Sequence, residues 1–212
     1  MLLLHTLDLF GTVVFAASGA LIAREQNRNG LIAVGYAVLT AVGGGTLRDL
    51  SLGQPIFWTK APAYLLLAVT AGLLVFLVST VARLHRQQLW LADAIGLATF
   101  TVIGTQVALQ LPATSFSPLL WWLAPMMGLA TGMGGGLVRD LLSRHTPYVL
   151  GCPIQAAASL AGGCTYSVLT IFRMPTCWTS GVAISIVLLA LPTINRALFQ
   201  FLKQQPPFSL LS

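Results

Sequence analysis

The chain has 212 residues, of which 56% are hydrophobic and 8% are charged, and its mean hydropathy is +0.84. Because a soluble domain carries about a quarter charged residues, this composition excludes an ordinary water-soluble protein. The net charge of +6 comes from basic residues spread singly between apolar runs, so the basic patch that nucleic-acid binding needs is missing. The composition instead predicts an all-α integral membrane protein embedded in a lipid bilayer.

Seven apolar segments follow one another along the chain, each about the length that crosses the hydrocarbon core of a bilayer. The connections between them are short, so consecutive helices are expected to lie side by side. The sequence therefore predicts seven transmembrane helices, at residues 6–23, 31–53, 61–81, 90–109, 119–142, 153–172 and 178–199. These segments occupy most of the chain and leave no room for a soluble domain.

The basic residues are distributed unequally between the two ends of the predicted helices. Eight of them follow the first, third and fifth segments or lie in the C-terminal tail, and three lie on the other side. Cytoplasmic loops carry the excess of Lys and Arg, so we expect the C-terminus in the cytoplasm and the N-terminus outside. The larger group is Arg24, Arg28, Arg83, Arg86, Arg139, Arg144, Arg196 and Lys203, and the smaller is Arg48, Lys60 and Arg173.

The first six segments form two copies of a three-helix unit. The stretch LDLFGTVVFAASG at 7–19 aligns with ADAIGLATFTVIG at 92–104, and GGGTLRDL at 43–50 aligns with GGGLVRDL at 134–141. An odd number of spans turns the second copy upside down in the membrane, which predicts an inverted repeat. The predicted units are the first repeat at 1–88, the second at 89–175, and the seventh helix with a short tail at 176–212.

Each copy carries three consecutive glycines in its second segment. Glycine readily leaves helical geometry, and three in a row, at about 1 kcal/mol each relative to alanine, predict a kink in each helix. Backbone groups freed inside a bilayer need protein or a water-filled cavity around them, so these kinks are expected to line a hydrophilic path. Close helix packing through small residues is the alternative. The candidate pore residues are Gly43, Gly44, Gly45, Gly134, Gly135 and Gly136, with the hydroxyl-bearing Ser18, Thr46 and Thr131.

Charged residues inside the segments also recur in both copies. Four of the five acidic residues lie in the two copies, two in each copy and at matching positions. In each copy an arginine directly precedes the second of these acids. Charges within spans usually mark ion paths or paired sites; N-capping by the acids and snorkelling of the arginines are the alternatives. The candidate pore-flanking or gating residues are Asp8, Arg48, Asp49, Asp93, Arg139 and Asp140.

The inverted repeat brings one acid and one arginine to the same depth on each side of the membrane. We expect Asp8 to pair with Arg48, and Asp93 to pair with Arg139, because an unpaired charge at membrane depth costs about 2.5–3.5 kcal/mol. The acids that directly follow the arginines are expected to point elsewhere, since adjacent residues on a helix do not face each other.

The residues do not favour an enzyme. No nucleophile lies in the spacing that a catalytic base would need, and the glycine triplets lack the Lys-Ser/Thr of a phosphate-binding loop. The cysteines, Cys152, Cys164 and Cys177, match no metal-ligand spacing, so we expect them to be small packing residues. No cofactor is expected.

The seven segments, the inverted repeat and the doubled GGG-x-x-RD motif resemble the prokaryotic branch of the trimeric intracellular cation channels, relatives once classed as glycine transporters. The resemblance covers nearly the whole chain. It implies a multi-pass protein of a prokaryotic inner membrane, a homotrimer, and a potassium-permeable pore in each protomer that the glycine kinks shape. Animal members carry a Lys-Glu motif linked to phosphoinositide lipid near the second-span kink. This sequence reads TLRDL there, so that regulation is not implied.

The resulting prediction is a monovalent-cation channel lined by the second and fifth segments, with no metal bound beyond transient potassium. Carbonyl and hydroxyl oxygens suit a partly dehydrated cation. A secondary transporter of a small zwitterion such as glycine is the alternative, because a broken helix offers amide ends to a carboxylate and carbonyl ends to a cation. A scaffold subunit without a pore is a weaker alternative.

Overall fold

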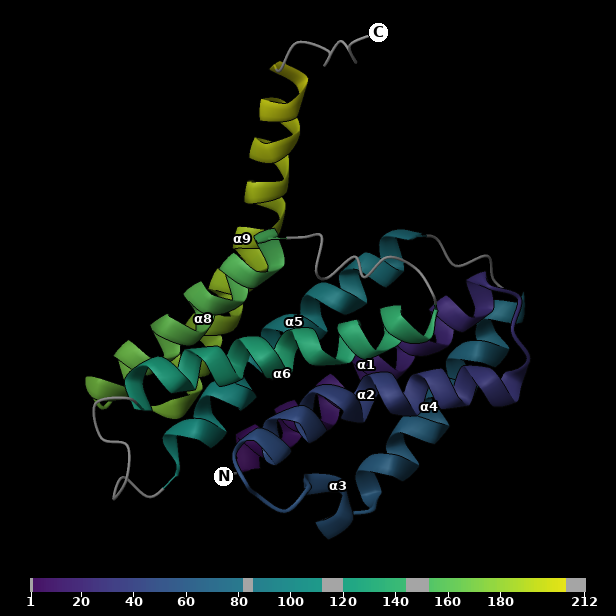
Figure 1. Ribbon diagram of the computed structural model, residues 1–212, viewed down its shortest axis with the longest axis horizontal. Coiled ribbons are helices and arrows are strands. Elements are labelled where there is room, and N and C mark those ends of the chain that lie inside the picture. Colours follow the sequence, from purple (N-terminus) through teal and green to yellow (C-terminus); the bar gives the residue numbers. More distant parts are fainter. Residues whose placement is uncertain (1, 82–85, 112–119, 144–152, 205–212) are drawn as a thin grey trace, which may run out of the picture.

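The computed structural model describes residues 2–81, 86–111, 120–143 and 153–204, and within these ranges every regular element is helical. Figure 1 shows the helices packed into one body, with the last of them extending beyond it. The helices are α1 (Leu2–Glu25), α2 (Gly30–Ser51), α3 (Phe57–Lys60), α4 (Ala63–Val81), α5 (Arg86–Leu109), α6 (Leu120–Leu142), α8 (Pro153–Ile171) and α9 (Thr176–Gln204).

Each predicted apolar segment falls on one of the long helices. By length and hydropathy, α1, α2, α5 and α8 contain candidate membrane spans within the described residues. The prediction of an all-helical integral membrane protein is confirmed. The short helix α3 was not predicted, because its four residues lie in a polar and proline-containing connection with no apolar run of their own.

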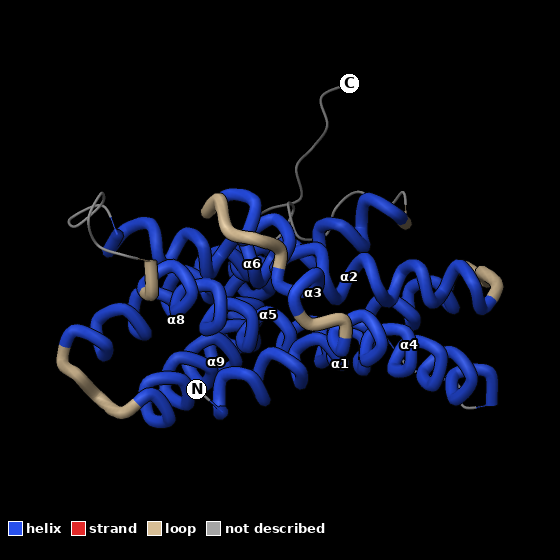
Figure 2. Tube along the Cα trace, turned by 90° about the horizontal axis from the view of Figure 1, so that it is seen from below, coloured by secondary structure: helices blue, strands red, loops and turns tan. Residues whose placement is uncertain are grey.

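The helices α1 and α5 occupy equivalent places in the body. The first packs against α2 and α4, the second packs against α6 and α8, and the two also contact each other. The helices α2 and α6 contact each other as well, and Figure 2 shows them along one side of the body, with α1 and α4 along the other. At the centre the rings of Phe15 and Phe100 are stacked, with their centroids 5.1 Å apart.

Contacts between the two halves are reciprocal. A methyl group added to Gly11 would press on the ring of Phe100, and one added to Gly96 would press on the ring of Phe15. These four residues occupy matching positions in the aligned copies. Each phenylalanine therefore packs into the space that the other half's glycine leaves open.

The glycine triplets follow the same reciprocal pattern between α2 and α6. A side chain at Gly44 would overlap the carbonyl oxygen of Thr131, and a side chain at Gly135 would lie 2.6 Å from the carbonyl oxygen of Thr40. The two glycines match in the alignment, as do the two threonines. Small residues thus let two helix backbones approach closely, as in other membrane helix pairs.

The glycine triplets do not end their helices, and the predicted kink at each triplet stays a prediction. Both α2 and α6 are continuous α-helices through residues 43–45 and 134–136. Glycine weakens an isolated helix because the chain gains conformational freedom. Here the partner helix holds each triplet on one side, so helical hydrogen bonding continues and no free carbonyl groups result.

Candidate functional site

Three helices bring a charged cluster together at the second Arg-Asp motif. Arg139 of α6 donates through Nη1 to Asp93 of α5 and to the hydroxyl of Ser18 on α1. The Ser18 hydroxyl donates to the same Asp93 oxygen at 2.6 Å. Asp140 accepts from Arg139 through Nε at 3.0 Å and through Nη2 at 2.8 Å. The predicted pair between Asp93 and Arg139 is therefore confirmed.

This second cluster is largely shielded from the surroundings. The side chains of Arg139 and Asp140 are 3% and 6% exposed, and that of Asp93 is 17% exposed. Asp93 lies inside α5, well after its first turn, so it does not cap that helix. The burial of Arg139 likewise rules out snorkelling to the membrane surface. Two carboxylates thus contact the same guanidinium.

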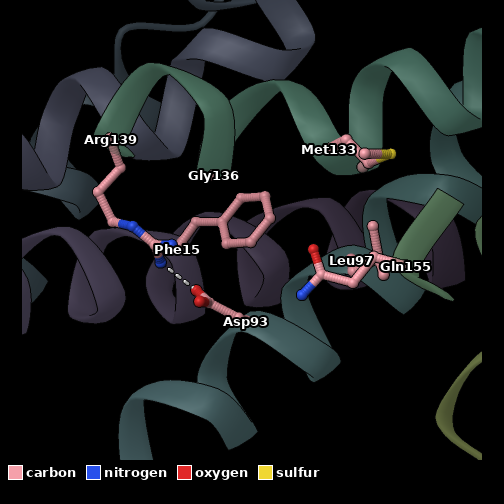
Figure 3. A pocket seen from close by; sticks show the side chains of 8 residues that line it. Phe15, Asp93, Leu97, Met133, Gly136, Arg139 and Gln155 are labelled. Carbon is pink, nitrogen blue, oxygen red and sulfur yellow. Dashed lines mark hydrogen bonds and ion pairs between the residues drawn. The ribbon is translucent and has the colours of Figure 1, made fainter. Parts of the chain in front are cut away.

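A small cavity opens beside the cluster. Its volume is about 10 Å³, close to the space that one water molecule needs. Figure 3 shows the carboxylate of Asp93 pointing to Arg139, the ring of Phe15 beside the pair, and Gln155 further along the cavity. The full lining is Phe15, Asp93, Leu97, Gly132, Met133, Gly136, Arg139 and Gln155.

The first charged cluster uses the same residue types in a different arrangement. Asp8 of α1 accepts a hydrogen bond from the hydroxyl of Tyr64 on α4 at 2.8 Å, and that hydroxyl lies 3.2 Å from Nδ1 of His5. Arg48 instead donates through Nε to the adjacent Asp49 at 2.7 Å. Among the described residues no ion pair links Asp8 to Arg48, so the predicted pair between them is wrong.

The physical reason is the reach of the arginine side chain. Adjacent Cβ atoms point apart on a helix, yet the long, flexible arginine folds back so that its fork meets the neighbouring carboxylate. The same contact joins Arg139 to Asp140. The expectation that the adjacent acids point elsewhere is therefore wrong in both clusters. The second oxygen of Asp49 accepts from the backbone N–H of Phe57 at 2.8 Å, which fixes α3 to α2.

The other predicted site residues have mixed placements. Gly43 faces Val138, and Gly134 faces Gly44, so these glycines contribute to helix packing. Only Gly136 of the triplets lines the cavity. Of the predicted hydroxyl groups, Ser18 joins the second cluster.

The remaining two predicted hydroxyl groups lie elsewhere. Thr131 donates to the carbonyl of Met127 at 2.6 Å, within its own helix. Thr46 donates to Val42 at 2.7 Å and accepts from the indole of Trp58 at 3.0 Å, which ties α3 to α2. Neither threonine lines the cavity.

Sequence reasoning missed Tyr64, Gln155 and Phe57. The first two occupy matching positions in the two copies, two residues after Pro62 and Pro153. That alignment places both near the acid of their own repeat, so the repeat itself held a signal for them. Phe57 sits in a connection that carries no comparable signal.

The architecture and the two charged clusters define a helical, multi-pass membrane protein with an ion pair between α5 and α6. A family model described as a glycine transporter matches residues 5–80 and 90–171. The UPF0126 inner membrane protein YadS of Escherichia coli K12 is 41% identical over 168 residues, which is 78% of each chain. The UPF0126 membrane protein YvgT of Bacillus subtilis is 34% identical over 161 residues, covering 74% of this chain and 76% of that protein.

Solved structures extend the comparison. The TRIC trimeric intracellular cation channel orthologue of Rhodobacter sphaeroides has a TM-score of 0.83 and 33% identity, over 91% of this chain and 97% of that one. A prokaryotic TRIC channel solved in 0.5 M KCl has a TM-score of 0.82 and 27% identity, over 93% and 98% of the two chains. The chain belongs to the trimeric intracellular cation channel family, and these similar structures are channels rather than enzymes.

Proposed function

We propose that the protein is a potassium-permeable channel for monovalent cations, with a path inside each protomer of a homotrimer. The observation that carries the proposal is the cavity at the second cluster, which is lined by the partly buried carboxylate of Asp93. The carboxylate of Asp93 borders this cavity, and carboxylate oxygens there favour cations over anions. The similar solved structures are trimeric intracellular cation channels, which supports cation conduction and trimeric assembly.

The same proposal gives α2 and α6 a shared role at the centre of the path. Gly136 borders the cavity, and its missing side chain leaves room beside Asp93 and Arg139. The hydrogen bonds from Arg139 to Asp93 and Ser18 join three helices across this point. Separation of these helices would widen the cavity, so the cluster is a candidate gate as well as a charge filter.

Seven membrane spans arranged as two inverted three-helix repeats form the framework of this proposal. The reciprocal contacts of Gly11 with Phe100 and of Gly96 with Phe15 support it, because an exchange of the two halves reproduces them. The family model matches one stretch in each half, at 5–80 and 90–171, which also supports the division. The seventh helix, α9, packs on α5 and α8 outside the repeat.

Transport of glycine is less well supported. A zwitterion site of the kind considered from the sequence needs a helix break that offers free amide and carbonyl ends. Both α2 and α6 are continuous at their triplets, so these ends are absent there. The cavity of about 10 Å³ is also smaller than an amino acid requires.

Proteoliposomes distinguish the two functions. Vesicles loaded with potassium and holding the purified protein should lose potassium when a proton ionophore balances the charge, and empty vesicles should not. The rate should be unaffected by glycine. Saturable glycine uptake coupled to a counter-ion, without such potassium loss, would favour the transporter.

The orientation of the chain is a separate prediction. The excess of Lys and Arg on one side of the predicted helices places the loop between α1 and α2 in the cytoplasm and the loop between α8 and α9 outside. In a background without native cysteines, Asn27→Cys should resist a membrane-impermeant thiol reagent added to intact cells and react after the cells are opened. Met174→Cys should react with the same membrane-impermeant reagent in intact cells. The opposite pattern would reverse the orientation.

A further inference from the structure

The cavity at the second cluster has a counterpart position in the first half of the chain. The cavity residues Asp93, Leu97, Gly136, Arg139 and Gln155 correspond, in that order, to Asp8, Thr12, Gly45, Arg48 and Tyr64. The correspondence follows from the aligned copies, and the reciprocal glycine contacts agree with it. The two positions differ in what fills them.

The side chain of Phe57 occupies the first-half position. Its ring centroid lies 5.7 Å from the guanidinium carbon of Arg48 and 4.9 Å from the ring centroid of Tyr64. A methyl group on Gly45 would come within 2.5 Å of the ring. One aromatic ring thus rests on three residues whose counterparts border the cavity in the second half.

The charged residues around the Phe57 ring are also paired differently from those of the second cluster. In the second cluster Arg139 donates to Asp93. In the first cluster Asp8 is held by Tyr64, and Nη1 of the buried Arg48 has no hydrogen-bond partner among the described residues. A buried donor without a partner is unfavourable, and Asp8 is held by a neutral hydroxyl. The first cluster can therefore adopt a second arrangement in which Arg48 donates to Asp8.

The helix that carries Phe57 is suited to movement. α3 has four residues, none of them buried. Two hydrogen bonds tie it to α2, one donated by the N–H of Phe57 to Asp49 and one donated by the indole of Trp58 to Thr46. Gly53, with a φ of 63°, lies in the connection that leads from α2 to α3. Segments with few buried contacts open at low free-energy cost.

We propose that Phe57 is a plug that closes the first-half end of the cation path. The proposal rests on the channel function proposed above. When α3 withdraws, the space over Gly45 becomes the counterpart of the cavity over Gly136. Arg48 then pairs with Asp8 as Arg139 pairs with Asp93, which stabilises the open arrangement. The two halves of this structure thus show the plugged and the unplugged form of one motif.

A labelling experiment tests the plug without relying on transport. The background lacks native cysteines, with Cys152, Cys164 and Cys177 replaced by serine. Thr12→Cys places a thiol at the counterpart of Leu97, which borders the cavity in the second half. Purified protein is treated with aminoethyl methanethiosulfonate, a small cationic reagent, and modification is followed by mass spectrometry. Phe57→Ala should raise the modification rate of this thiol about tenfold, because loss of the ring opens the space over Gly45 through which the reagent would enter.

Two further variants make the result decisive. Phe10→Ala removes a phenylalanine from the exposed surface of α1 and should leave the rate unchanged. If Phe57→Ala gives no folded protein, Phe57→Leu is used, which keeps an apolar side chain with less bulk and should raise the rate about threefold. An unchanged rate in the folded Phe57 variant would overturn the plug.

Single-channel recording then separates this proposal from the channel function. Phe57→Ala should raise the open probability about tenfold with the unitary conductance unchanged, and Phe10→Ala should leave both as in the wild type. Wild-type currents with equal open probability in Phe57→Ala would overturn the plug and leave the channel standing. An absence of currents from every variant, together with faster labelling of Phe57→Ala, would support the plug as a moving element and overturn the channel.

Discussion

Replacement of Gly44 by leucine is expected to remove most of the folded protein. Even a methyl group at this position overlaps the carbonyl oxygen of Thr131, and that atom belongs to the backbone of α6, which cannot turn aside. The two helices would have to separate along the contact that holds the halves together. Overpacking of this kind costs about 3 kcal/mol or more, which exceeds the loss from an ordinary surface change.

Gly35 supplies the matched control for this prediction. It lies on the same helix, between two and three turns from the triplet, and a side chain there would meet nothing within 4 Å. Gly35→Leu should keep the wild-type yield of monodisperse protein in detergent and the wild-type unfolding temperature, since leucine also favours the helix over glycine. A Gly44→Leu protein that folds as well as Gly35→Leu would show that the triplet does not set the helix spacing.

Breaking the ion pair of the second cluster is expected to have a similarly large effect. Arg139→Gln leaves the carboxylates of Asp93 and Asp140 without their shared donor in a buried site. Removal of one member of a buried pair costs about 3–5 kcal/mol, because the remaining charge is uncompensated. Chemical unfolding in detergent measures the change. Arg28→Gln, on an exposed turn, should change the free energy of unfolding little.

The pairing itself is measured by combining substitutions. Asp93→Asn should also destabilise the protein, and the double variant with Arg139→Gln should lose less than the sum of the single losses. The same cycle for Asp8→Asn and Arg48→Gln should be close to additive, because these two residues do not pair in this structure. Additivity at the second cluster, or strong coupling at the first, would contradict the arrangement described here.

Much of the helical framework could be predicted from the sequence because a bilayer demands long apolar segments, and these stand out in the residues themselves. The Asp93–Arg139 pair could be predicted as well, since the repeat places both residues at one depth. Both results depend on regularities that extend over many residues. Contacts with a residue from a connecting segment or from a third helix leave no such pattern in the sequence.

The failures at the first cluster show this limit. Arg48 pairs with the adjacent Asp49, and Phe57 contacts both residues, through its N–H to Asp49 and through its ring beside Arg48. Asp8 accepts a hydrogen bond from Tyr64, which lies in the first turn of α4. Neither contact follows from spacing along one helix.

The close packing of the glycine triplets was left open by the sequence for a related reason. Helix propensity describes an isolated helix, and it predicts weakness wherever glycines follow one another. In this protein each triplet meets the other across α2 and α6, and the same missing side chains that weaken one helix permit the close contact of two. Packing was the alternative that the sequence left open, and it is the one observed at Gly44 and Gly135.

The central claim, a cation path inside the protomer, is tested most directly by recording from purified protein in planar bilayers with potassium chloride on both sides. Discrete unitary current steps are expected, with a reversal potential that follows the potassium gradient when the two sides differ. Leu97→Cys, whose side chain borders the cavity, should lose current after treatment with the cationic thiol reagent. A reversal potential that follows chloride, or unitary currents that this modification leaves unchanged, would contradict a cation path through the cavity.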